Sequence, residues 1–293
     1  MTLPEAVVSK RGAATAHPAP DLANLVEEAQ ALTAHAEFDD AMRAFCRNLT
    51  DFHARSRREG IVDTITWAIA VFVIHCDATE PKGVNASRLI AVCRPGGLSG
   101  RAAARNAIDV LIHSGMIAAE DEPGPGLPRR LRPTPKLIET MRENLTVRLA
   151  AIERVIPWPA PAQTWARAPG VLAAFVGGQL AALSQENFVL FDRFPEVRAF
   201  MDRHCGYLVL LDALGRAEAT PTGAAASAPP SDVARKFAVS PAHVRKLFGA
   251  AAAQGWLAYR PGGRIAFGAE SYSRLRLWIG HEFAWTRRLL AAV

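Results

Sequence analysis

The sequence predicts a mainly helical protein with small β-hairpins, in which one structural unit occurs twice. Residues 84–135 and residues 231–267 carry this prediction. Each stretch reads as a short capped helix, a turn, a longer helix that ends before a glycine, and a hairpin with basic residues. This order is typical of the winged helix-turn-helix, in which the second helix enters the major groove of DNA and the hairpin contacts the backbone or the minor groove.

Length and composition allow two such units in one chain. The protein has 293 residues, of which 50% are hydrophobic, so it can bury more than one core. A formal net charge of +6 suits a polyanionic partner. Only five of the 34 basic residues are lysines, which fits either a phosphate-binding and guanine-binding surface or an arginine-biased genome.

The predicted domains follow one another along the chain. We expect a flexible tail over residues 1–20, N-terminal helices over 21–57, a first winged helix over 58–155, a helical connector over 156–205 and a second winged helix over 206–293. The stretch 218–230 is rich in Ala, Pro, Ser and Thr, so we expect an exposed loop there.

The N-terminal helices contain an apolar stripe at helical spacing. Its members are Phe38, Met42, Phe45, Leu49 and Phe52. Something has to cover such a stripe. It either seals a homodimer through residues 21–57 or packs on the chain's own first domain. We favour the homodimer, because the stripe has no evident use in either winged helix.

Capping residues place the helices of both units. Asn85 is the predicted N-cap of the first short helix, and Ser231 is that of the second. Ser240 is the predicted cap of the longer helix in the second unit, with Pro241 at its first position, where a missing N–H costs nothing.

The longer helix of the first unit carries a candidate recognition face. We expect Ser99 to cap it and Arg101, Arg105 and Asn106 to lie on its polar side. Arginine can read guanine and asparagine can read adenine at base edges. The alternative is a solvated face on which Arg105 pairs with Asp109 at the i,i+4 spacing.

The remaining candidate DNA contacts lie on the second unit and on the two hairpins. On the helix of the second unit they are Ser240, Ala242, His243, Arg245 and Lys246. On the hairpins they are Arg129, Arg130 and Arg132 in the first unit and Arg260 and Arg264 in the second. Arginines at a hairpin tip suit phosphate or minor-groove contacts, although a basic edge hairpin also serves solubility.

Residues 84–140 resemble the winged-helix domain of the multiple-antibiotic-resistance regulator (MarR) family. The resemblance lies in Ala86–Leu89, in Leu98-Ser99, in Leu111–Ile117 and in Arg129–Lys136. It implies a recognition helix in the major groove, a wing arginine (Arg129 or Arg130) in the minor groove, a dimer of terminal helices and a response to a small ligand or oxidant. The chain departs from the family in its Pro/Gly-rich hairpin tip, in Leu137 where a glycine usually follows, and in its second unit.

The sequence indicates neither an enzyme nor a cofactor. The eight histidines are scattered without a metal-ligand pattern, and the four cysteines lie far apart, although Cys93 leaves room for a redox sensor. Gly177-Gly178 lies in an apolar helix and is expected to be a close packing point rather than a phosphate loop. The apolar runs 61–76 and 171–183 are too short to cross a membrane, and no signal peptide is evident, so we expect a cytoplasmic protein.

These observations favour a sequence-specific regulator of transcription that binds double-stranded DNA. One alternative is a plasmid-type replication initiator with tandem winged helices, which would bind repeated sites at an origin rather than promoters. Another is a protein-interaction scaffold that uses winged helices for docking and binds no DNA at moderate salt. The family resemblance also implies a small-molecule effector.

Overall fold

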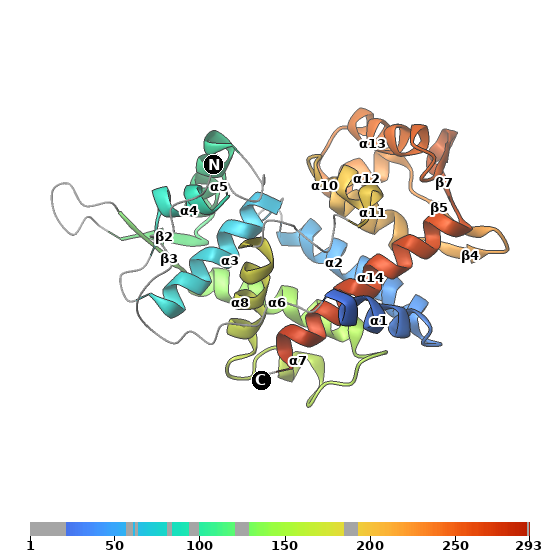
Figure 1. Ribbon diagram of the computed structural model, residues 1–293. Coiled ribbons are helices and arrows are strands. Elements are labelled where there is room, and N and C mark those ends of the chain that lie inside the picture. Colours follow the sequence, from blue (N-terminus) through green and yellow to red (C-terminus); the bar gives the residue numbers. More distant parts are fainter. Residues whose placement is uncertain are drawn as a thin grey trace, which may run out of the picture.

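The computed structural model describes residues 22–56, 61, 64–80, 84–93, 100–120, 129–184, 193–291 and 293. Within these ranges the chain is mainly helical and carries small antiparallel sheets (Figure 1). None of the helices in the same ranges has both the length and the apolar character that crossing a membrane requires.

The first repeated unit lies at the left of Figure 1. Its elements are α3 (Thr64–Thr79), β1 (Val84–Asn85), α4 (Ala86–Cys93), α5 (Arg101–His113), β2 (Ile117–Ala119) and β3 (Arg130–Pro133), and α6 (Pro135–Ile152) follows. Strand β3 lies between β1 and β2 and pairs antiparallel with both. The predicted cap of α4 is confirmed, because the Oδ1 of Asn85 accepts a hydrogen bond of 3.0 Å from the backbone N–H of Arg88.

The second unit lies at the right of Figure 1 and repeats this order of elements. It consists of α11 (Gly206–Gly215), β4 (Glu218–Thr220), β5 (Gly223–Ser227), α12 (Pro230–Phe237), α13 (Pro241–Ala253), β6 (Ala258–Arg260), the 3₁₀ turn η3 (Pro261–Gly263), β7 (Arg264–Gly268) and α14 (Ala269–Leu290). Strand β7 lies between β5 and β6, as β3 lies between β1 and β2. The extra strand β4 extends the sheet on the far side of β5.

Two expectations for the start of this unit are wrong. The stretch 218–230 is not a loop, because β4 and β5 form a hairpin within it and β5 pairs with β7 over five residues. Alternate small side chains are buried along β5, and the weak apolar contrast of alanine hides that alternation in the sequence. Ser231 does not cap α12, which begins at Pro230 with Pro229 at the N-cap position.

Of the N-terminal helices, α2 lies between the two units and α1 lies on the second. Helix α1 (Leu22–Thr33) packs along α14, and α2 (Phe38–Ser56) packs against α6 of the first half and α11 of the second. All five members of the predicted stripe are fully buried within the chain. Phe38 and Phe45, for example, place their rings 5.6 and 5.3 Å from that of Phe283 on α14. The stripe is therefore buried inside the chain, but its helix packs on α11 and α14 of the second unit as well as on α6, and not on the first domain alone.

The predicted connector also belongs to the core. It contains α7 (Ala162–Trp165), α8 (Val171–Ser184) and α10 (Pro195–Met201). Helix α8 packs against α3 and α14, so it contacts both halves. Gly178 is a close packing point, as expected, because a Cβ at this position would overlap the side chain of Leu289.

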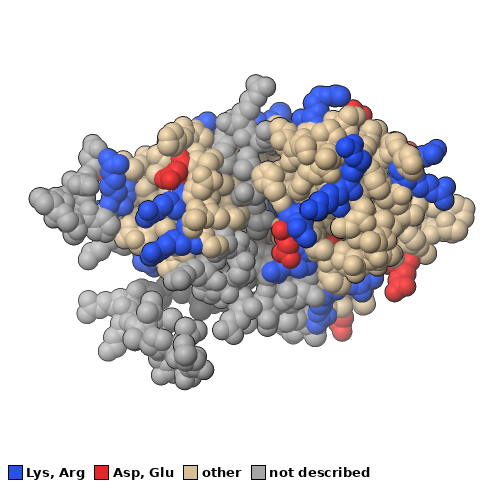
Figure 2. Space-filling view, turned by 90° about the horizontal axis from the view of Figure 1, so that it is seen from above, with Lys and Arg blue, Asp and Glu red and all other residues tan. Residues whose placement is uncertain are grey.

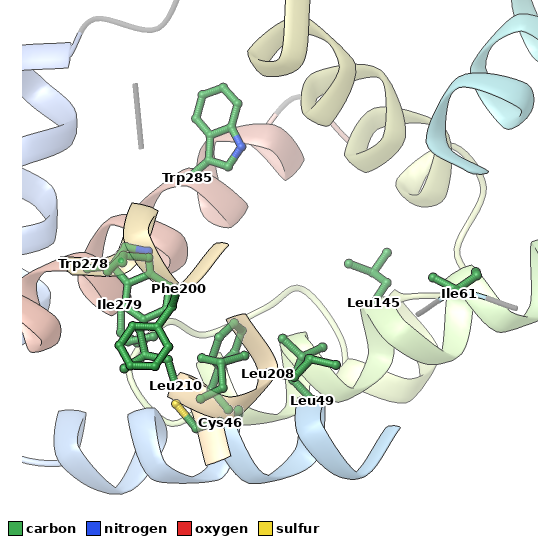
Figure 3. Close-up of a cluster of buried hydrophobic side chains, with 14 of the residues drawn as sticks. Cys46, Leu49, Ile61, Leu145, Phe200, Leu208, Leu210, Trp278, Ile279 and Trp285 are labelled. Atoms are coloured by element: carbon green, nitrogen blue, oxygen red, sulfur yellow. The ribbon is translucent and has the colours of Figure 1, made fainter. Parts of the chain in front are cut away.

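One continuous apolar core joins these helices. Figure 3 shows part of it, with side chains from α2, α6, α10, α11 and α14, Trp278 among them. Trp278 is 0% exposed and lies 5.9 Å from the ring of Tyr207. The two units are thus held by shared packing and not by a loose tether.

Candidate nucleic-acid interface

Helix α13 presents a basic face to solvent. The predicted cap is confirmed, because the Oγ of Ser240 accepts a 3.0 Å hydrogen bond from the backbone N–H of His243, and Pro241 occupies the first turn. Val244 and Phe248 are fully buried, and they anchor one side of the helix. The opposite side carries exposed residues, namely Ala242, Arg245, Lys246 and Gly249. Arg245 and Lys246 form no ion pair with any described residue, so both are available to a ligand.

His243 has a more structural setting than Arg245 and Lys246. Its Nε2 donates a 2.8 Å hydrogen bond to the backbone carbonyl of His204, just before α11. The imidazole is half-buried, and it holds the start of α13 against the segment that leads into α11.

The hairpin after α13 places two arginines opposite each other. Arg260 on β6 pairs with Arg264 on β7, and both side chains are exposed. Gly263 between them has a φ of +82° and a Cβ there would overlap the backbone of Ala228, so only glycine fits this tight turn. Like charges directly across a sheet are destabilising unless an anion neutralises them. A groove of about 680 Å³ beside this pair is also lined by Arg216.

Helix α5 of the first unit has the predicted division of faces. Ala104, Ile108 and Leu111 are buried, and Arg101, Arg105 and Asn106 are exposed. The alternative pairing of Arg105 with Asp109 is absent in this described helix. The helix begins at Arg101 with Gly100 at the N-cap position, and Ser99, the predicted cap, lies outside the described residues.

The predicted wing arginines of the first unit differ in their surroundings. Arg129 is exposed and Arg130 half-buried, and neither forms an ion pair with a described residue. Arg132 instead binds acidic residues, with its Nη1 2.9 Å from the Oδ1 of Asp77 and its Nε hydrogen-bonded to Glu120. These bonds raise the pKa of the Arg132 guanidinium. Arg132 therefore holds β3 to α3 and to the end of β2, and its charge is already neutralised.

The two helices lie on the same side of the molecule. In Figure 1 both α5 and α13 are at the top, and Figure 2 views that side directly. In Figure 2 Lys and Arg side chains are visible on both the left and the right parts of this face, and a few acidic side chains lie among them. This face carries both candidate recognition helices.

A buried polar cluster below this face is absent from the sequence prediction. Arg148 of α6 and Glu282 of α14 have side chains only 9% and 7% exposed, and their Nη1 and Oε2 atoms are 3.6 Å apart. Burial raises the pKa of Glu282, and the nearby Arg148 opposes that shift. The available signal was a charged residue inside an apolar stripe, because Arg148 lies between Leu145 and Leu149 on α6.

The same cluster predicts a pH dependence of stability. Burial, followed by the charge of Arg148, lowers the pKa of His53 to about 3. The unfolded chain binds a proton near pH 6.5, whereas the folded chain does not, so stability is full above that pH and falls as the pH drops towards 3. We expect urea unfolding between pH 6.5 and 5 to lose about 1 kcal/mol per pH unit from this group.

Replacing His53 with glutamine tests its contribution to this pH dependence. His53→Gln should make the fall of the unfolding free energy with decreasing pH shallower, and His204→Gln, at an exposed position, should leave it unchanged. An identical slope in all three proteins would contradict the assignment. Burial also lowers the pKa values of His75 and His281, so a residual decline is expected after the His53 replacement.

The described residues contain no group of three or more His, Cys, Asp or Glu side chains placed to hold a metal ion. Cys46, Cys76 and Cys205 are buried, and burial raises the pKa of Cys76 to about 11. Cys93, the candidate redox sensor, has a side chain outside the described part of the structure.

Comparisons of this chain with protein-family models, with curated proteins and with solved structures found no match.

Proposed function

We propose that the chain is a cytoplasmic, sequence-specific regulator of transcription that binds double-stranded DNA through two winged helix-turn-helix units. One observation carries the proposal. Apart from the additional strand β4 in the second unit, the order helix, strand, helix, helix, strand, strand occurs twice, each time with the last strand between the other two. In each unit the helix before the hairpin exposes arginine beside small or amide side chains, which allows close approach to base edges.

The arrangement favours DNA over a purely structural role for the units. A docking scaffold needs no unpaired cations at these positions, whereas Arg245, Lys246, Arg260 and Arg264 all lack acidic partners among the described residues. Because one chain carries two different recognition faces, it can span two unlike half-sites about one helical turn, roughly 34 Å, apart. A homodimer would need a surface other than the buried Phe38–Phe52 stripe.

Arg245 provides the test of base reading. Arg245→Ala should weaken binding to a selected site by about 1–3 kcal/mol and weaken binding to random duplex much less, if the guanidinium forks onto a base. Lys246→Ala should weaken both DNAs equally, as expected for a phosphate contact. Fluorescence anisotropy with the two duplexes measures both effects.

The control for this measurement is Arg287→Ala. Arg287 is exposed near the end of α14, which lies at the bottom of Figure 1, away from α5 and α13. The control should bind both DNAs like the unchanged protein. Equal losses on selected and random DNA for Arg245→Ala would contradict base reading by this residue.

A further inference from the structure

Arg148 lies where the two units meet. Its guanidinium carbon is 5.7 Å from the ring centre of Trp67 on α3, the helix that opens the first unit. Its charge also acts on the side chain of Tyr207 on α11, the helix that opens the second unit, where it opposes the rise in pKa that burial causes. A single buried side chain on α6 therefore lies near the opening helices of both units.

The same guanidinium reaches the two other helices at this junction. It stacks 5.5 Å from the ring centre of Phe45 on α2 and faces Glu282 on α14. Its Nε donates a 2.9 Å hydrogen bond to the Oδ1 of Asn144, one turn earlier on α6, and this bond fixes its orientation. Residues on five helices thus surround one cation.

Helix α2, which packs on α6, is also bonded to the second unit. Lys236 on α12 places its Nζ 2.7 Å from the Oδ1 of Asp51 on α2 and 2.9 Å from the Oδ1 of Asp212 on α11. Phe45 therefore lies on a helix that is bonded to α12 of the second unit, and Glu282 lies on α14 of the same unit. Arg148 links that body to α6 and α3 of the first unit.

A buried ion pair is a costly way to fill this space. Well-packed apolar residues of similar volume usually give equal or greater stability, because burying two charges removes their hydration. A guanidinium differs in being directional, since its planar fork fixes the angles of its partners, whereas apolar contacts are non-directional. The cluster thus adds orientation to a junction that apolar packing already stabilises.

We propose that Arg148, together with Glu282, is a positioning residue that fixes the separation and angle between α5 and α13 and so selects one spacing between two DNA half-sites. The selection of one half-site spacing rests on the proposed function. The fixed separation and angle of α5 and α13 in the free protein do not depend on DNA binding.

The first experiment measures that geometry without DNA. Arg148→Met/Glu282→Leu replaces the pair with apolar side chains and leaves no buried charge unpaired. Spin labels are attached at two exposed positions, Ala103→Cys on α5 and Ala250→Cys on α13. Pulsed electron paramagnetic resonance then measures the distance between the two labels. Cys93→Ser is added throughout, and the other three cysteines are buried.

The control variant removes another Arg–Glu pair, one that involves α14, the helix that carries Glu282. Arg274 on α14 has its Nε 2.9 Å from the Oε1 of buried Glu196 on α10, and both helices pack within the second half. The control variant is Arg274→Met/Glu196→Leu. We expect the distance distribution to broaden about twofold in the Arg148 variant and to keep its width in the control, with cooperative thermal unfolding in both.

The second experiment uses unlabelled protein and duplexes that carry both half-sites at separations varied over about one helical turn. The unchanged protein should prefer one separation about tenfold or more, and the Arg148 variant should lose that preference while binding single half-sites normally. An unchanged distance distribution, or equal broadening in the control, overturns the positioning role. If the unchanged protein binds no DNA, the proposed function fails and the label distances still decide the positioning role.

Discussion

Replacing Arg148 alone with methionine should lower the free energy of unfolding by about 3–5 kcal/mol, because Glu282 then stays buried without its cation. This loss of unfolding free energy relative to the unchanged protein, here called the deficit, should depend on pH. Burial already holds the pKa of Glu282 above its ordinary value, and removing Arg148 raises that pKa further. The stability gained by protonation is present at low pH and is lost as the pH rises through the folded pKa.

Urea unfolding at pH 5 and pH 8 measures this effect. The deficit of Arg148→Met relative to the unchanged protein should be smaller at pH 5 than at pH 8. Arg154→Met, at an exposed position just after α6, should show little deficit at either pH. A deficit for Arg148→Met that is equal at both pH values would contradict the role of Glu282 as its unpaired partner.

Removing four hairpin arginines should weaken binding to any duplex by about 10³-fold near physiological salt. The variant replaces Arg129, Arg130, Arg260 and Arg264 with alanine and keeps Arg132, which Asp77 and Glu120 already neutralise. Each lost phosphate contact removes about 0.9 from the slope of log K against log salt, so the slope should fall by about 3–4.

The control for this measurement carries the same change in charge elsewhere. It replaces Arg142, Arg154, Arg167 and Arg287, which lie on or beside α6, α7 and the end of α14, at the bottom of Figure 1. Anisotropy titrations from low to high salt should give this control the slope of the unchanged protein. Equal slopes for the two quadruple variants would remove the hairpins from the DNA interface.

The parts of the fold that the sequence predicts are those with local causes. Asn85 and Ser240 cap their helices as expected, because a cap depends only on a side chain and a backbone N–H three residues later. The buried sides of α5 and α13 also follow directly from helical periodicity. The exposed faces of α5 and α13, which form the candidate site, could therefore be predicted from the sequence alone.

The remaining features depend on contacts between distant segments. Nothing in the Phe38–Phe52 stripe indicates that Phe283, over 200 residues later, covers it. Strand β5 is hidden for another reason, since alternation among alanine and serine gives little apolar contrast. Arg132 looks like a free wing arginine until the fold brings Asp77 beside it.

Selection from a random duplex library tests whether the two units of one chain read duplex DNA together. The protein is used near physiological salt, and the retained sequences are determined. We expect an enriched site with two different halves at one separation of about one helical turn, and loss of one half for the Arg245→Ala variant. Retention without any enriched sequence, or no retention at all, would show that the two units do not read DNA together.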